Sequence, residues 1–65
     1  MHSRELIKLL KRNGCRFIRH GKGDHQVWFS STTGMKFTVP HPNKDLPIGT
    51  VRAIFRAAGI EYKPH

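Results

Sequence analysis

The sequence predicts a small α+β domain in which two helices cover one face of a three-stranded antiparallel sheet. Apolar residues recur at helical spacing near both ends of the 65-residue chain. Between these ends lie three short segments rich in β-branched and aromatic residues, separated by turn residues. A chain of this length is expected to form one domain, so residues 1–65 are taken as a single unit.

The first helix is expected over residues 3–13. Ser3 is a favoured N-cap residue, and Glu5 follows in the first turn, where the helix dipole favours an acid. The apolar face of this helix consists of Leu6, Leu9 and Leu10, with Ile7 at its margin. The Asn-Gly pair at 13–14 tolerates the left-handed conformation that ends helices, so the helix is expected to stop there.

Three strands are expected over residues 15–20, 26–30 and 35–39, joined by short turns at 21–24 and 31–34. Short turns produce an antiparallel meander. Alternation places Cys15 and Phe17 on one side of the first strand, and Arg16, Ile18 and His20 on the other. In the third strand, Phe37 and Val39 alternate with Lys36 and Thr38. Pro40 is expected to end the ladder because it has no N–H to donate.

The last element is a helix that begins near Pro47 and ends at Gly59. Its apolar face consists of Val51, Ile54, Phe55 and Ala58, and Ile60 and Tyr62 are expected to fold back onto the core. Two apolar helix faces need one surface to cover, and one face of the sheet supplies it. The other face stays open, which is the layout of a double-stranded-RNA-binding-like fold.

The charge of the chain indicates a polyanionic ligand. Twelve Lys and Arg residues against four Asp and Glu give a net charge of +8, spread over every segment. No apolar run approaches the length of a membrane span, and the charged first turn is atypical of a signal peptide, so a cytoplasmic protein without membrane contact is expected. One cysteine excludes an intramolecular disulfide, and no ligand pairs have zinc spacing. No metal or cofactor is expected.

His25 is the candidate catalytic residue, because it follows the flexible basic turn Gly21-Lys22-Gly23-Asp24 at the mouth of a strand. Histidine, with an ordinary pKa of about 6.5, suits proton transfer at neutral pH. Gly21 and Gly23 permit close approach of a phosphate to the backbone. Positive charge for phosphate binding is expected from Arg16, Arg19, Lys22 and Lys36. Asp24 could orient the imidazole or repel the phosphate, and the sequence leaves both open.

The chain resembles the HicA (YcfA-type) toxins, which are small RNA-cleaving partners in bacterial toxin–antitoxin pairs. The resemblance covers roughly residues 3–60 and rests on LIKLLKRNGCRFIRHGKGDHQVW and TVPHPNKDLPIGTVRAIFRAAGI. Its matching pieces are N-G before the first strand, R-x-G-x-G-x-H across the first turn, V-P-H-P after the third strand, and G-T-V-R-A-I in the last helix. The catalytic histidine of the family falls on His25. Asp24 stands where the family usually has a serine.

The resemblance implies a metal-independent ribonuclease that cleaves mRNA, inhibits growth and is neutralised by a HicB-type antitoxin. The alternative function is a non-catalytic double-stranded RNA-binding module of the same topology. DNA binding by this chain is not expected, because strands separate its two helices and helix-turn-helix recognition needs neighbouring helices.

Three further residues are auxiliary candidates with two interpretations each. His41, between two prolines, is either a loop residue or the second proton-transfer group, and His20 could face either side of the sheet. If Val27 and Phe29 pack under the helices, Trp28 stands on the open face and could stack on a base. Otherwise Trp28 lies in the core or packs on the antitoxin.

Overall fold

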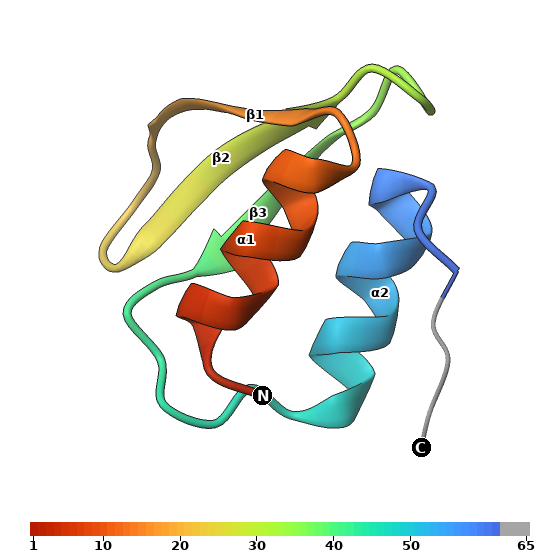
Figure 1. Cartoon of the computed structure of the whole chain (residues 1–65). Helices are drawn as coiled ribbons and strands as arrows, with labels where there is room; N and C mark the ends of the chain where they lie inside the picture. The colour runs from red at the N-terminus through yellow and green to blue at the C-terminus, as the bar shows by residue number, and fades with distance from the viewer. Residues whose placement is uncertain (62–65) are drawn as a thin grey trace.

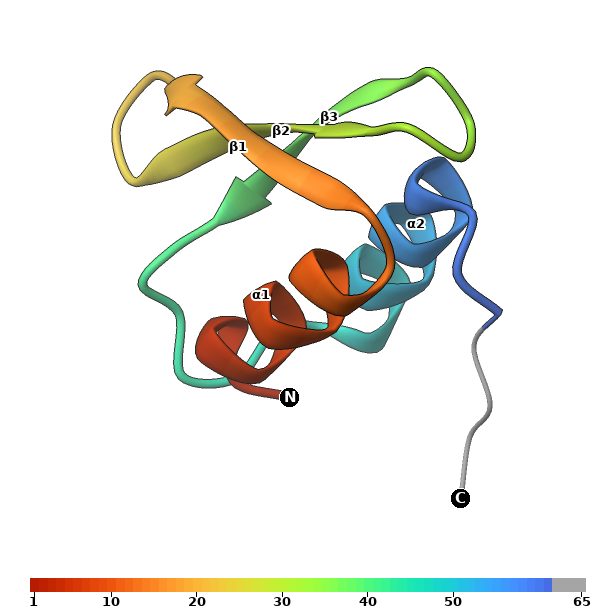
Figure 2. The same cartoon turned by 45° about the horizontal axis from the view of Figure 1, so that its top comes forward.

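The structure, a computed structural model, describes residues 1–61 and has the predicted order of elements: α1 (Ser3–Arg12), β1 (Cys15–His20), β2 (His25–Ser30), β3 (Lys36–Pro40) and α2 (Ile48–Ala58). The strands form one antiparallel sheet in the order β1-β2-β3. Both helices lie on the same face of this sheet (Figures 1 and 2). The predicted fold class is therefore confirmed. The expected return of Tyr62 to the core lies outside the described residues.

The hydrophobic core fills the layer between the sheet and the helices. It consists of Leu6, Leu10, Cys15, Trp28, Val39, Leu46, Val51, Ile54, Phe55 and Ala58. The apolar faces predicted for the two helices supply most of this set, and Ile60 packs against it as expected. Within residues 1–61, neither helix is long and apolar enough to span a membrane.

His2, not Ser3, is the N-cap of α1, so the predicted cap is wrong by one residue. The Nδ1 atom of His2 accepts the backbone N–H of Arg4 at 3.0 Å. Ser3 is the first helical residue and is fully buried. Its Oγ lies 2.7 Å from Nδ1 of His41 and accepts the backbone N–H of Asn43 at 2.9 Å. The Ser3 hydroxyl is therefore bonded to the loop after β3 instead of capping the helix, and the residues around Ser3 in the sequence do not reveal this contact.

A β-bulge interrupts the alternation of β1. Phe17 pairs with Trp28. Arg19 pairs with Val27, which is the adjacent residue of the antiparallel strand β2, so Ile18 has no partner. Beyond the bulge, the side chains of β1 lie on the opposite face from the one that strict alternation predicts. His20, which was expected on the side of Arg16, therefore lies on the helix side with Phe17, and Arg19 takes the opposite side. The strand prediction was right in its bounds and wrong in this alternation.

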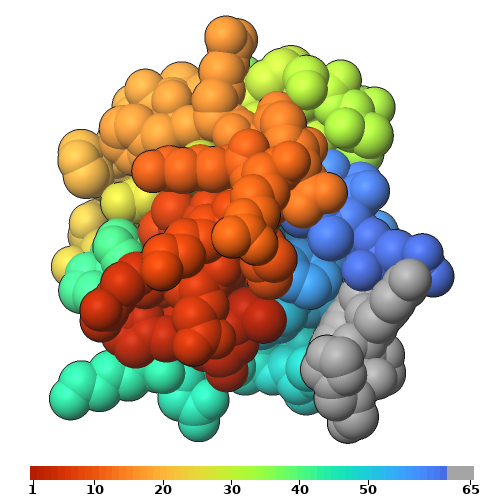
Figure 3. Space-filling model, viewed as in Figure 1, coloured from red at the N-terminus to blue at the C-terminus, as the bar shows by residue number. Residues whose placement is uncertain are grey.

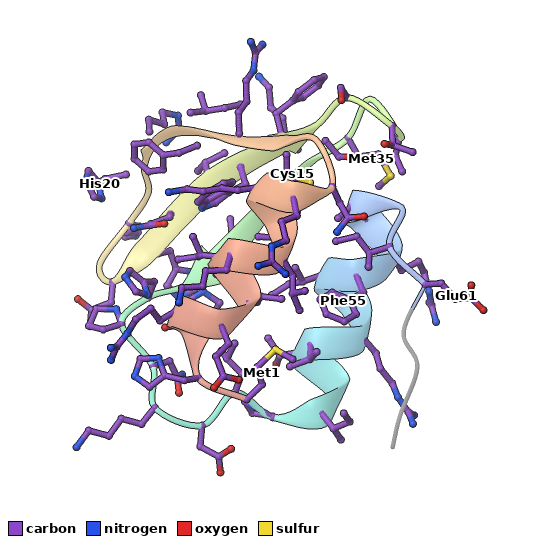
Figure 4. The ribbon with its side chains drawn as sticks, in the orientation of Figure 1. Met1, Cys15, His20, Met35, Phe55 and Glu61 are labelled. Carbon is purple, nitrogen blue, oxygen red and sulfur yellow. The ribbon has the colours of Figure 1, made fainter. Side chains whose placement is uncertain are left out.

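The turn between β2 and β3 is fixed to the C-terminal end of α2 by two hydroxyl groups. Ser30 Oγ donates to the carbonyl of Ala58 at 2.7 Å, and Thr33 Oγ1 donates to the carbonyl of Ala57 at 2.5 Å. Gly59 ends the helix with a positive φ of 77°. Met35 marks this end of the sheet and His20 marks the opposite end, next to the β1–β2 turn (Figure 4).

Candidate active site

The sheet face turned away from the helices is called the open face. Cross-strand pairing and alternation place eight residues on it: Arg16, Arg19, His25, Val27, Phe29, Lys36, Thr38 and Pro40. Arg16, Phe29 and Lys36 form one row across the three strands, and Arg19, Val27 and Thr38 form the next. Three of the predicted phosphate-binding side chains thus share one face of the molecule.

The basic residues of the open face lie beside apolar and hydroxyl-bearing residues. The guanidinium carbon of Arg16 lies 5.3 Å from the centre of the Phe29 ring, which is a cation–π contact. A hollow of about 450 Å³ follows the same row and is lined by Arg16, Phe17, Ile18, Phe29 and Lys36. Ile18, at the bulge, is 38% exposed. The open face therefore combines positive charge with accessible apolar surface.

His25 is the first residue of β2 and is exposed. Its backbone is fixed by the turn, since its carbonyl accepts the N–H of Gly21 at 2.7 Å and its own N–H donates to the carbonyl of Lys22 at 3.4 Å. Gly23 permits this turn with a φ of 64°. Within residues 1–61, the imidazole makes no hydrogen bond or ion pair. A fixed backbone thus carries a side chain that is available to a ligand.

Gly21 lies beside the side chains of His25 and Val27. A Cβ atom at this glycine would lie 3.6 Å from Cβ of His25 and 3.5 Å from Cγ2 of Val27. These short distances also show that His25 and Val27 point to the same side, as alternation requires. At Gly23, by contrast, an added Cβ would meet no atom within 4 Å.

Lys22 and Asp24 are exposed in the turn before β2. The backbone carbonyl of Asp24 accepts the N–H of His41 at 2.7 Å. Within the described chain, its carboxylate makes no hydrogen bond or ion pair with His25. The orienting role of Asp24 therefore stays a prediction.

His41 and His20 lie on the helix side, away from His25. They line a groove between α1 and the sheet together with Ile7, Lys11, Phe17, Gln26 and Trp28. His41 is half-buried and is held through Nδ1 by Ser3. The structure thus does not bring His41 and His25 together on one face, although their backbones are close at the end of the sheet.

Trp28 lies under the helices, which decides between the two interpretations that the sequence left open and excludes the open face. It is 2% exposed and belongs to the core, and its Nε1–H donates to Oε1 of Gln26 at 3.0 Å. It pairs across the sheet with Phe17 and Phe37 on the helix side, while Val27 and Phe29 take the open face. The large indole covers more apolar area in the core than either neighbour would. The interpretation of Trp28 as a core residue is confirmed.

Sequence reasoning left the face of Phe29 open, and it missed the groove. Phe29 and Trp28 are neighbours in β2 and lie on opposite faces of the sheet, so the position of Trp28 in the core decides that of Phe29. The groove depends on the bulge at Ile18 and on the contact between Ser3 and His41, which are 38 positions apart. Within residues 1–61, no three His, Cys, Asp or Glu side chains gather so as to hold a metal ion.

Fold and site together define the class: a small α-β-β-β-α domain whose open sheet face is basic and carries an exposed histidine. A family model described as "HicA toxin of bacterial toxin-antitoxin" matches residues 3–60. The chain belongs to this family and is a toxin of a toxin–antitoxin system, in which an antitoxin is its partner. Proteins of this family are generally ribonucleases. Comparisons with curated proteins and with solved structures gave no match.

Proposed function

We propose that this toxin is a metal-independent endoribonuclease that cleaves single-stranded RNA, with mRNA as its cellular target and His25 as its catalytic residue. The observation that carries the proposal is the position of His25. This exposed, unpaired imidazole shares the open face with Arg16, Arg19 and Lys36, and Lys22 lies in the adjoining turn.

In the proposed reaction, RNA supplies its own nucleophile. The 2′-oxygen forms a bond to phosphorus, the bond from phosphorus to the 5′-oxygen breaks, and the products are a 2′,3′-cyclic phosphate and a 5′-hydroxyl end. His25 transfers a proton at one of the two oxygens, either from the 2′-hydroxyl or to the leaving 5′-oxygen. The guanidinium and ammonium groups of the open face balance the charge that develops on the phosphate oxygens.

The size of the open face fits a short stretch of RNA. Phe29, in the row of Arg16 and Lys36, lies four residues along β2 from His25. Four residues of a strand span about 14 Å, which is longer than the spacing of neighbouring phosphates on a single strand. An RNA strand that contacts the whole face would therefore place phosphates both at the imidazole and at the distal basic row.

The antitoxin is proposed to be of the HicB type and to cover the open face with acidic groups. Such contact would neutralise the arginine and lysine side chains and would cover His25. RNA and antitoxin would then compete for one surface. Lys22→Ala is expected to weaken binding of both.

The test is cleavage of labelled single-stranded RNA in EDTA by the parent protein and by His25→Ala. The substitution should lower the cleavage rate by a factor of about 10² to 10⁴. It should change the free energy of unfolding by no more than about 0.5 kcal/mol, because the side chain is exposed. His2→Asn is the matched control, since it removes another histidine but keeps an N-capping side chain for α1.

Two outcomes would contradict the proposal. Cleavage by folded His25→Ala at the parent rate would show that another group performs the chemistry. A parent protein that retards RNA but leaves it intact would indicate the non-catalytic double-stranded RNA-binding module, which has the same order of elements. Comparing single-stranded and double-stranded probes of one sequence separates these cases.

A further inference from the structure

The groove on the helix side has the composition of a base-binding site. It encloses about 360 Å³ and is lined by Ile7, Lys11, Phe17, His20, Gln26, Trp28 and His41. In the space-filling view, the loop after β3 (green) lies against α1 (red), beneath the β1–β2 turn (yellow-orange) (Figure 3). Gln26 directly follows His25 in β2 but points to the other face of the sheet. The groove and the candidate catalytic residue therefore lie on opposite faces of the sheet, near the same end of β2.

The amide of Gln26 presents hydrogen-bond donors to this groove. The indole N–H of Trp28 can only donate, so the atom that it contacts at 3.0 Å must be Oε1 of Gln26. The NH₂ group of the amide is thereby turned away from Trp28. No buried side-chain nitrogen or oxygen in residues 1–61 lacks a partner, and no protein partner is seen for this NH₂ group, so it is accessible from the groove.

His41 supplies a second donor. Ser3 Oγ accepts the N–H of Asn43 at 2.9 Å and lies 2.7 Å from Nδ1 of His41. Within residues 1–61 this fully buried hydroxyl has no third partner, so its hydrogen is assigned to the bond with Nδ1. A neutral imidazole that accepts at Nδ1 carries its proton at Nε2. The ammonium group of Lys11 adds a third donor, and the lining contains no carboxylate. Gln26, His41 and Lys11 thus each offer a donor to the groove.

Aromatic side chains form part of the lining of the groove. Phe17 is 43% exposed although it points to the helix side, and its ring lies 5.1 Å from the ring of His20 and 6.0 Å from that of Trp28. Both contacts are edge-to-face, which leaves a face of the exposed ring available for stacking. A planar ligand would fill this space.

We propose that the groove binds one base of the RNA substrate and prefers guanine or uracil. Guanine presents N7 and O6 as adjacent acceptors, and uracil presents O4. Adenine and cytosine carry amino donors at the corresponding edge, which would face the donors of Gln26 and His41. Phe17 stacks on the base, and the RNA passes around the β1–β2 turn to reach His25. This inference rests on the proposed function, because it assumes that RNA is the substrate.

The test is titration of the full chain with the 5′-monophosphates of guanosine, uridine, adenosine and cytidine, followed by nuclear magnetic resonance. The chain has one tryptophan, so its indole N–H resonance reports on the groove without ambiguity. Inorganic phosphate is the reference for binding through the phosphate alone. The guanosine and uridine nucleotides should shift this resonance and the Gln26 amide, and should bind at least about fivefold more tightly than the other two, the low end of discrimination by good base-edge contacts.

Gln26→Glu tests the donor directly. A carboxylate keeps an oxygen for the Trp28 indole, so the fold should persist, but it replaces the NH₂ donor by an acceptor. The preference for guanosine and uridine nucleotides should disappear or reverse. Lys44→Gln, in the exposed loop after β3, changes the net charge by the same amount and should leave the preference unchanged.

Two results would overturn the inference: equal binding of the four nucleotides, or groove resonances that move no more than with inorganic phosphate. Either result can occur while the RNA is still cleaved, in which case the proposed function stands and the groove assignment fails alone. If the nucleotides bind selectively but RNA is not cleaved, the groove assignment holds and the catalytic proposal fails.

Discussion

The Ser3 hydroxyl is expected to hold the loop after β3 against α1, and Ser3→Ala measures this contribution. The side chain is 0% exposed, and its oxygen is shared by two partners in one loop, the imidazole of His41 and the N–H of Asn43. The backbone N–H of Ser3 also donates to the carbonyl of Asn43 at 2.9 Å, and this bond survives the substitution. Alanine therefore removes two of three contacts at this junction.

The expected loss follows from those two bonds. Each contributes about 1 kcal/mol net, and the partners left behind are only partly buried, which limits the penalty for leaving them unpaired. The higher helix propensity of alanine offsets about 0.5 kcal/mol of this loss in stability. The free energy of unfolding should fall by about 1–2 kcal/mol. For a chain of this size, that lowers Tm by roughly 4–16 °C.

Thermal and urea unfolding, followed by the fluorescence of Trp28, would measure this change. Ser31→Ala is the matched control, because this serine hydroxyl also bonds to a residue distant in sequence, donating to the carbonyl of Gly14 at 3.0 Å, but in an exposed turn. Its expected cost is within about 0.5 kcal/mol. If Ser3→Ala costs no more than Ser31→Ala, the buried hydroxyl does not fix the loop, and the orientation inferred for His41 loses its support.

Two further predictions concern charge and backbone conformation. The logarithm of RNA affinity should fall against the logarithm of salt concentration with a slope of about −2 to −3.5, for about three to five phosphate contacts on a single strand. Lys22→Ala should reduce this slope by about 0.7, whereas Lys8→Ala, on α1, should not change it, and a parent slope near zero would contradict phosphate binding. Gly59→Ala should destabilise the fold by more than about 1–2 kcal/mol, because a left-handed φ of 77° is combined with a Cβ only 2.9 Å from a threonine methyl of the β2–β3 turn. Gly23→Ala shares the positive φ but has open space around it, so equal melting temperatures for the two variants would show that the close contact is unimportant.

The elements of the fold could be predicted because their signals are local. The four apolar residues expected on α2 are the four that are buried there, and the glycine expected to end this helix has the left-handed conformation. The cap of α1 could not be predicted in the same way. Ser3 is a good N-cap residue by type, but its hydroxyl is bound by His41, 38 positions away. A long-range contact overrides a local preference without leaving a mark in the neighbouring residues.

The candidate site was predicted in its components but not in its arrangement. The basic residues and His25 were identified from charge and from the glycine-rich turn. Their sides of the sheet depend on the alternation of β2, where Val27, Trp28 and Phe29 are consecutive and apolar. Such a run has no polar side to mark the surface, so only packing of the indole against the helices decides which face is covered.

The bulge at Ile18, more than the identity of the bulged residue, decides which side chains of β1 share a side. Because one residue is skipped, side chains three positions apart share a side: Arg16 with Arg19 on the open face, and Phe17 with His20 on the helix side. Replacing Ile18 by another residue would preserve both sets. If the strand lost its bulge but kept Ile18, Ile18 would take the place opposite Val27, and Arg19 and His20 would exchange sides. One cation would then leave the open face and one ring would leave the groove in a single event. Among related toxins, loss of the bulge at constant strand length would therefore alter both surfaces together, whereas point substitutions that keep the bulge could change each surface independently.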